Sequence, residues 1–225
     1  MRGCCSAAHP DARMRPYIDQ HAALGVAHED VPDLCLRLYQ AYGTTLAGLV
    51  AEGRHGDIDH EKWHAAVHAP LPYEVALQGK DEALRAMLQR LPQRRIVFTN
   101  ADRAHAETCL AILGVRDLFE DVICFETLNP DNPLRAGASV LNKPKAEAFE
   151  HALRLARADA ATTLFCDDSR RNVEAAAKAG IFAVHVGGEP GTEPPEGVTV
   201  AIDCIKQLPG AVPQLLELPP EKLRN

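Results

Sequence analysis

Three groups of polar residues could do chemistry together. Thr99 and Asn100 follow the apolar run IVF, Asp167 and Asp168 follow TLFC, and Lys143 precedes a proline that opens a predicted helix. A hydroxyl, an amide and a helix N-terminus can hold phosphate oxygens, and a lysine brings a positive charge to the same anion. Adjacent carboxylates suit Mg²⁺, which also takes phosphate and water as ligands. These residue types therefore predict a site for phosphoryl transfer.

Each group alone also has a plain structural interpretation. A Thr-Asn pair after a strand is typical of a turn, a Lys-Pro step is typical of a helix start, and Asp-Asp-Ser before a helix is typical of a cap. What favours a site is that the groups lie at the ends of predicted strands or the start of a helix. Ligands of open parallel sheets bind at the carboxyl ends of the strands.

The elements that must position these residues begin near Asp81, where helical and strand patterns alternate. Helices are predicted over 81–91, 102–114, 144–156, 169–180 and 205–218, and strands over 94–100, 121–126, 162–168, 181–186 and 198–202. The strands are continuous apolar runs, as expected when helices cover both faces of a parallel sheet. The sequence therefore predicts an open α/β fold.

The chain before Asp81 has a different pattern and contains no convincing strand. Helical spacing runs over 31–50 with an interruption at Gly43, and again over 59–68. We therefore expect a small all-helical unit there, preceded by a loose N-terminal segment.

Composition limits the classes of function. The 225 residues carry 24 Lys and Arg against 31 Asp and Glu, a formal charge of -7, and 46% of them are hydrophobic. The chain can bury a core, but it lacks the basic field of a protein that grips nucleic acid by its phosphates. No apolar run approaches the roughly 18 residues of a membrane span.

The seven scattered cysteines are typical of a reduced, intracellular protein, so we expect a cytoplasmic location. The first 16 residues bear a faint likeness to an organellar transit segment. The sequence leaves the oligomeric state open.

Three histidines fall on one face of the predicted helix over 59–68. His60, His64 and His68 are spaced i, i+4, i+8, which is the pattern of a metal-binding array. No cysteine or second acidic cluster in the sequence completes that array, so a solvated or substrate-facing surface is the favoured interpretation. His68 is a candidate specificity residue.

Short motifs resemble those of a known family. FTN (98–100), NKPK (142–145) and FCDDSRRN (165–172) resemble three motifs of the haloacid dehalogenase superfamily of phosphohydrolases. TLAGL (45–49), HAPLPYE (68–74), TNADRAHA (99–106) and CFETLNP (124–130) resemble its pyrimidine 5′-nucleotidase branch. The resemblance implies a Rossmann-like parallel sheet with a helical cap, Mg²⁺ and an aspartyl-phosphate intermediate. It places the N-terminal segment and cap in residues 1–80 and the α/β core in 81–225.

The resemblance also implies roles for individual residues. By position, Thr99 and Asn100 would bind phosphate, Lys143 would stabilise the nucleophile and the transferring phosphate, and Asp167 and Asp168 would anchor Mg²⁺. The substrate would be a small phosphomonoester such as a nucleoside monophosphate.

Two further residues are candidates for contact with such a nucleotide. Arg103 and His105 lie on the helix after Thr99 and Asn100, from which they could reach the nucleotide on the core side. The alternative interpretation of both is an exposed first turn of that helix.

The sequence departs from the family at its most important motif. The family begins with an apolar strand ending in D-x-D-x-T, whose first Asp is the nucleophile and whose second is the general acid and base. Here the D-x-D pattern occurs only at Asp57 and Asp59, after AEGRHG rather than after a strand, and we reject it as the nucleophile.

The missing strand also matters for folding. In the family it lies in the middle of the sheet, between the strands that end here at Thr99 and Asp167. Either another segment fills that position, or the sequence is a shortened form of a longer protein, which is the interpretation we favour. The two functional hypotheses are a Mg²⁺-dependent phosphatase impaired by this loss and a catalytically silent phosphate-binding homologue.

Two other parallel-sheet proteins are disfavoured. A response-regulator receiver has its acidic pair first, then Thr, then Lys, whereas here the order is Thr99, Lys143, Asp167 and Asp168. A haloacid dehalogenase proper needs no metal, so the paired carboxylates favour phosphate chemistry.

Overall fold

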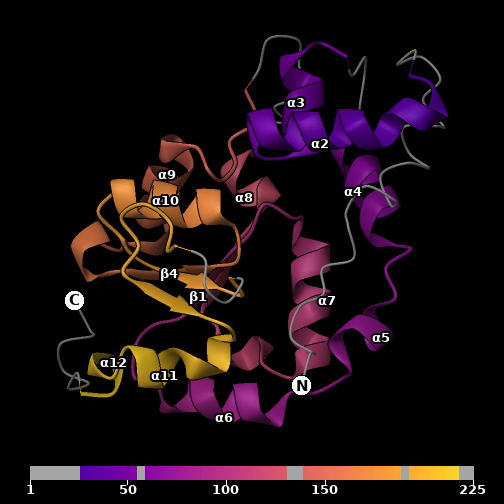
Figure 1. The fold of residues 1–225 in the computed structure, drawn as a ribbon. Helices are drawn as coiled ribbons and strands as arrows, with labels where there is room; N and C mark the ends of the chain where they lie inside the picture. Colours follow the sequence, from indigo (N-terminus) through magenta and orange to yellow (C-terminus); the bar gives the residue numbers. More distant parts are fainter. Residues whose placement is uncertain (1–25, 55–58, 131–138, 189–192, 218–225) are drawn as a thin grey trace.

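The computed structural model describes residues 26–54, 59–130, 139–188 and 193–217 (Figure 1). Its first part is helical, as the sequence predicts. A short 3-10 turn, η2 (His28–Asp30), leads into α2 (Val31–Tyr42), α3 (Thr45–Ala51), α4 (His60–His68) and α5 (Tyr73–Leu77).

Local chemistry sets the ends of these helices. Gly43 closes α2 with a φ of 87°, which is the left-handed conformation that glycine adopts without strain. The Thr44 hydroxyl accepts a hydrogen bond from the N–H of Ala47, 3.1 Å away, and thereby caps α3. Asp59 caps α4 in the same manner. The helices pack on a core that includes Leu38, Leu49 and Trp63 and that also contains Phe125 and Val140 of the second part.

The second part alternates helices and strands. Its helices are α6 (Glu82–Arg90), α7 (Arg103–Leu113), α8 (Phe125–Leu128), α9 (Ala146–Ala156), α10 (Arg170–Lys178), α11 (Leu208–Ala211) and α12 (Gln214–Glu217). Its strands are β1 (Ile96–Phe98), β2 (Asp121–Ile123), β3 (Leu164–Asp167), β4 (Phe182–Val186) and β5 (Val200–Ile202). Short 3-10 turns lie at η3 (Arg116–Leu118), η4 (Ala160–Thr162) and η5 (Ile205–Gln207).

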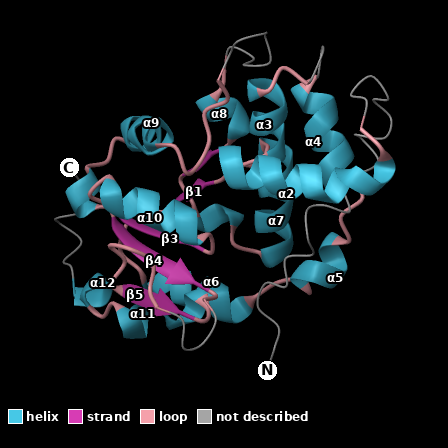
Figure 2. Cartoon of the chain, turned by 45° about the horizontal axis from the view of Figure 1, so that its top comes forward, coloured by secondary structure: helices cyan, strands magenta, loops and turns pink. Residues whose placement is uncertain are grey.

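All pairs of described strands are parallel, and helices cover both faces, which confirms the α/β prediction (Figure 2). Neighbouring residues of β4 point to opposite faces. Ala183 belongs to a cluster with Phe149 of α9 and Val173 of α10. Val184 belongs to another cluster with Leu88 of α6 and further residues of α7 and α11.

The strands form two sheets rather than one. β1 pairs with β2, and the second sheet has the order β3-β4-β5. β1 and β3 lie near each other through their aromatic side chains, since the rings of Phe98 and Phe165 are 6.0 Å apart and Phe149 contacts both. No described strand lies between them, at the position that the resemblance implies for the family's first strand.

The backbone at this gap gives a testable expectation. Peptide groups alternate in direction along a strand. The N–H of Thr99 donates to Ile123 O at 2.9 Å on the β2 side, so the N–H of Phe98 points away from β2. By the same alternation the N–H of Cys166 points away from β4. We expect these two amides to exchange with deuterium at least about tenfold faster than the amide of Thr99, as NMR exchange would show. Equal protection of all three would contradict an unpaired edge.

Several boundaries differ from the sequence prediction. The predicted strand over 121–126 ends at Ile123, because Cys124 caps the short helix α8 through its contacts with Thr127. The predicted last helix is divided into η5, α11 and α12, with Pro213, which lacks an N–H, between α11 and α12. Ser169 precedes α10, but its side chain makes no capping bond.

Two sequence expectations about composition can be compared with the structure. Cys109, Cys124 and Cys166 carry free thiols, and burial raises the pKa of Cys166 to about 12. Cys4 and Cys5 lie outside the described residues. None of the described helices has the length and apolar character needed to cross a membrane.

Candidate functional site

Lys143 spans the gap between the two sheets. Its Nζ donates to Phe98 O at the end of β1 and to Asp167 Oδ2 at the end of β3, each at 2.7 Å. The same atom lies 4.9 Å from the ring centre of Phe98 and 5.2 Å from that of Phe165. The residue is only 6% exposed. A buried cation therefore lies between the two strand ends, where a ligand of an open sheet would bind.

The two acidic residues after β3 have different environments. Asp167 is buried, and its Oδ1 accepts hydrogen bonds from the N–H of Ser169 and from Asn172 Nδ2, each at 2.9 Å. Asn172 thus orients the carboxylate of Asp167. Asp168 is exposed, and its carboxylate has no partner among the described residues.

Asn100 holds the main chain of Lys143. Its Nδ2 donates to Lys143 O at 2.9 Å, and its Oδ1 accepts from the N–H of Lys143 at 2.8 Å. The turn between α2 and α3 packs on the same peptide. A Cβ at Gly43 would lie 2.5 Å from Lys143 O, so only glycine fits there. The structure therefore shows Asn100 as a positioning residue, and its contact with phosphate stays a prediction.

Thr99 lies in a turn at the end of β1. Its hydroxyl oxygen accepts a hydrogen bond from the N–H of Ala101 at 3.1 Å. This is the plain turn role that the sequence left open. The structure brings Thr99 and Asn100 to the same edge as Lys143, Asp167 and Asp168, so the residues predicted for phosphate and metal do meet.

The candidate substrate residues divide into two groups. His68 lies against Asp102, and its ring stacks on that of His105 with centroids 4.1 Å apart. The hydroxyl of Tyr73 lies 2.7 Å from His105 Nδ1. Arg103 instead directs one guanidinium nitrogen to Val122 O, in the middle of β2, and to the hydroxyl of Thr127 on α8. Its contacts are those of a structural residue.

Two features of the histidine face differ from the sequence interpretation. His64 is buried, so the surface expected there is not solvated at this residue. An acidic partner is present as well, because folding brings Asp102 against the helix. Sequence reasoning missed Asp102, and the one available signal was its place at the residue before α7, where aspartate is a common helix cap.

The D-x-D pattern at 57–59 lies partly outside the described residues, which include Asp59 but not Asp57. The side chain of Asp59 accepts hydrogen bonds from the N–H groups of Glu61 and Lys62. This capping role agrees with our rejection of the pattern as a nucleophile.

The parallel α/β architecture, with a lysine and paired carboxylates at the strand ends, defines a class of hydrolase. The haloacid dehalogenase-like hydrolase family matches residues 18–180, well over half of the chain. The chain belongs to this family.

One curated yeast protein is similar to this chain in sequence. "Phosphate metabolism protein 8" of Saccharomyces cerevisiae is 28% identical over 166 residues, which are 70% of this chain and 49% of that protein. The chain thus spans about half the length of this curated relative.

Solved structures support the fold. A HAD phosphatase from Thermococcus onnurineus has a TM-score of 0.54 at 14% identity. The match covers 88% of this chain and 87% of the phosphatase chain. A 2-haloacid dehalogenase from Pseudomonas syringae has a TM-score of 0.52 at 19% identity over 95% of both chains.

The paired carboxylates can be tested for fit to Mg²⁺, on which hydrolases of this family typically depend. The donors are hard oxygen atoms, one carboxylate is exposed, and phosphate and water would complete the six ligands that Mg²⁺ requires. The donor set therefore fits the ion. Asp168 is the accessible carboxylate of the pair, and the Asp167 side chain is the less exposed one.

Proposed function

We propose that this chain is a phosphatase of the family, of the kind that acts on small phosphomonoesters with Mg²⁺ and by way of an aspartyl-phosphate, and that the missing nucleophile motif impairs its chemical step. The observation that carries the proposal is the position of Lys143 between the ends of β1 and β3, beside Asp167 and Asp168. Phosphate carries negative charge, and this edge brings together a buried cation and two carboxylates of the kind that bind Mg²⁺. By resemblance, the substrates would be pyrimidine nucleoside monophosphates.

Each residue has a task in this proposal. Lys143 would hold the phosphoryl oxygens and balance their charge, and Asn100 would fix the main chain of Lys143. Asp167 and Asp168 would hold Mg²⁺, which when bound supplies further charge neutralisation at the phosphate. Thr99 would donate its hydroxyl to a phosphate oxygen. The nucleophilic carboxylate would come from a strand placed between β1 and β3.

A second candidate function is favoured by the same gap. No described strand lies between β1 and β3, and the sequence has no strand ending in D-x-D. A chain with the phosphate and metal residues but without the nucleophile would bind phosphate and not turn it over. Such a silent phosphate-binding homologue differs from the first candidate only in the chemical step.

Binding can be tested independently of catalysis. We expect inorganic phosphate to bind this chain in the presence of Mg²⁺, and Asp168→Asn to weaken that binding at least about tenfold because a charged ligand of the ion is lost. Isothermal titration calorimetry measures both. Asp203→Asn, an exposed aspartate beyond β5, is the control and should bind as the unchanged chain does. Phosphate binding that is absent, or indifferent to Mg²⁺ and to Asp168, would contradict both candidate functions.

A further inference from the structure

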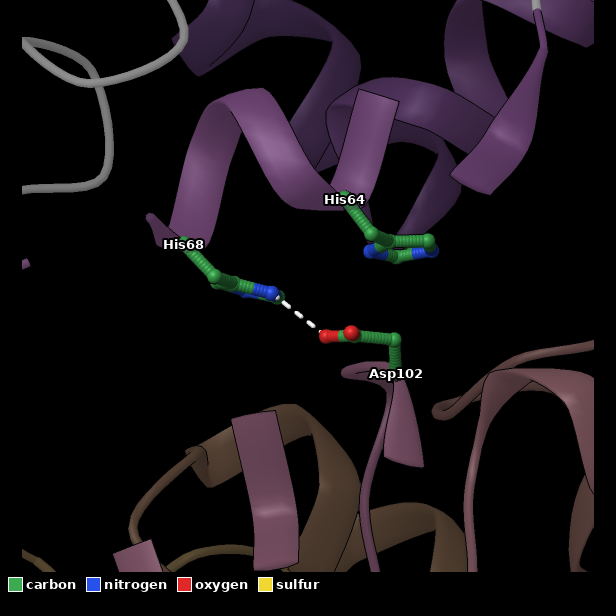
Figure 3. Close-up of side chains that lie close together, drawn as sticks. All are labelled: His64, His68 and Asp102. Carbon is green, nitrogen blue, oxygen red and sulfur yellow. Dashed lines mark ion pairs between the residues drawn. The ribbon is translucent and has the colours of Figure 1, made fainter. Parts of the chain in front are cut away.

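A second cluster of ligand-type side chains lies where α4 meets the start of α7. His64 and His68 lie one helical turn apart on α4, and Asp102 directly precedes α7 (Figure 3). One nitrogen of each histidine and one oxygen of Asp102 all lie within 4.8 Å of one another. None of these residues belongs to the edge formed by Lys143 and Asp167.

One buried atom of this cluster lacks a partner. His64 is 7% exposed, and its buried Nε2 has no hydrogen-bond partner among the described residues. His68 Nδ1 and Asp102 Oδ1 lie 2.5 Å apart, which holds the carboxylate beside the two imidazoles. Buried polar atoms are nearly always paired in folded proteins, so the unpaired Nε2 of His64 beside His68 and Asp102 points to a missing ligand.

Burial lowers the pKa of His64 to about 4. Burial raises the pKa of Asp102, but the contact with His68 and the charges of His68, His64 and His105 together bring it below its usual value.

We propose that His64, His68 and Asp102 form a binding site for a divalent transition metal of the Zn²⁺ class. Two imidazoles and one carboxylate are a ligand set that Zn²⁺ accepts, with a fourth position left for water. Metal–ligand distances of 2.0–2.2 Å put tetrahedral ligand atoms roughly 3.4 Å apart. Small side-chain shifts therefore turn the present cluster into a tetrahedral site. Mg²⁺ prefers oxygen ligands, so this site and the carboxylate pair at Asp168 select different ions.

The surroundings hold the ligands in place. His105 stacks on His68 with an interplanar angle of 22°, and the Tyr73 hydroxyl contacts His105. The ring of Phe125 packs against His64 from the other side, with centroids 4.7 Å apart. A metal bound here would join α4 of the helical part to α7 of the α/β part, and it would thereby fix the two parts relative to each other.

The test uses the full chain without an affinity tag, after treatment with a chelator. We expect one Co²⁺ per chain with the visible absorption of a tetrahedral site, and competition by Zn²⁺ but not by Mg²⁺. His64→Ala and Asp102→Asn should each weaken Zn²⁺ binding at least about tenfold in calorimetry, because one of three protein ligands is lost. Asp102→Asn keeps the size of the side chain, so it tests the site even where His64→Ala disturbs packing.

His151→Ala is the matched control, because His151 lies on α9 outside the cluster and should leave binding unchanged. Cys4→Ser with Cys5→Ser should also leave it unchanged. Absence of stoichiometric Co²⁺ binding would overturn the proposal, as would binding that persists in His64→Ala and Asp102→Asn. The measurement involves no phosphate, so it does not depend on the proposed phosphatase function.

Discussion

Replacing Lys143 with alanine should lower the free energy of unfolding by about 3–5 kcal/mol, the range found when one partner of a buried ion pair is removed. The side chains of Lys143 and Asp167 are 7% and 8% exposed, and their charged atoms are 2.7 Å apart. Without the lysine, Asp167 stays buried without its counter-charge, and Phe98 O loses its hydrogen bond. Urea unfolding followed by circular dichroism measures the loss.

An exposed ion pair provides the matched control. Lys178 pairs with Glu196 at 3.4 Å, and both side chains are more than half exposed. Lys178→Ala should therefore change the free energy of unfolding by less than about 1 kcal/mol. The double variant Lys143→Met, Asp167→Asn should recover part of the loss, because no unpaired charge remains. A loss for Lys143→Ala as small as that for Lys178→Ala would show that the buried pair does not hold the two sheets together.

Adding an apolar strand that ends in D-x-D-x-T to the N-terminus should raise phosphate release from UMP or CMP with Mg²⁺ by at least about 10³-fold over the present chain. The physical reason is covalent catalysis, because the added carboxylate can attack the phosphoryl group held by Lys143. A strand parallel to β1 and β3 could pair with the peptide groups that face the gap, such as those of Phe98 and Cys166. Colorimetric measurement of inorganic phosphate gives the rate.

The control for this experiment carries Asn in place of the first Asp of the added motif. It restores the strand and its hydrogen bonds but not the nucleophile, so it should fold like the active version and release no phosphate. If the extended chain is inert on every phosphomonoester, the phosphatase proposal fails. In that event phosphate binding at Asp168 would leave the silent homologue as the function of this site.

Much of the fold could be predicted from the sequence, because its signals are local. Continuous apolar strands indicated a parallel sheet, and Gly43, which interrupts the helical spacing in the sequence, ends α2 in the left-handed conformation. The short helices α5 and α8 were missed. Each has five residues or fewer, which is too short for a helical period to stand out.

The residues at the strand ends were also predictable, since the carboxyl ends of parallel strands meet at one edge of the sheet. Motif spacing identified Thr99, Lys143 and the pair Asp167 and Asp168. Motif spacing gave no information about how the side chains share their hydrogen bonds. The ion pair between Lys143 and Asp167 joins residues 24 positions apart, and Asn100 reaches the Lys143 peptide across 43 positions.

The sequence by itself determined the parallel α/β class and the family motifs, and it shows no apolar strand ending in D-x-D among the residues given. Only the tertiary structure decided that the sheet divides beside Lys143, because strand pairing depends on which segments lie next to each other. It likewise decided that Asp102 meets His64 and His68. Asp102 is more than 30 positions from either histidine in the chain, and only the packing of α4 against the start of α7 brings a carboxylate to two imidazoles.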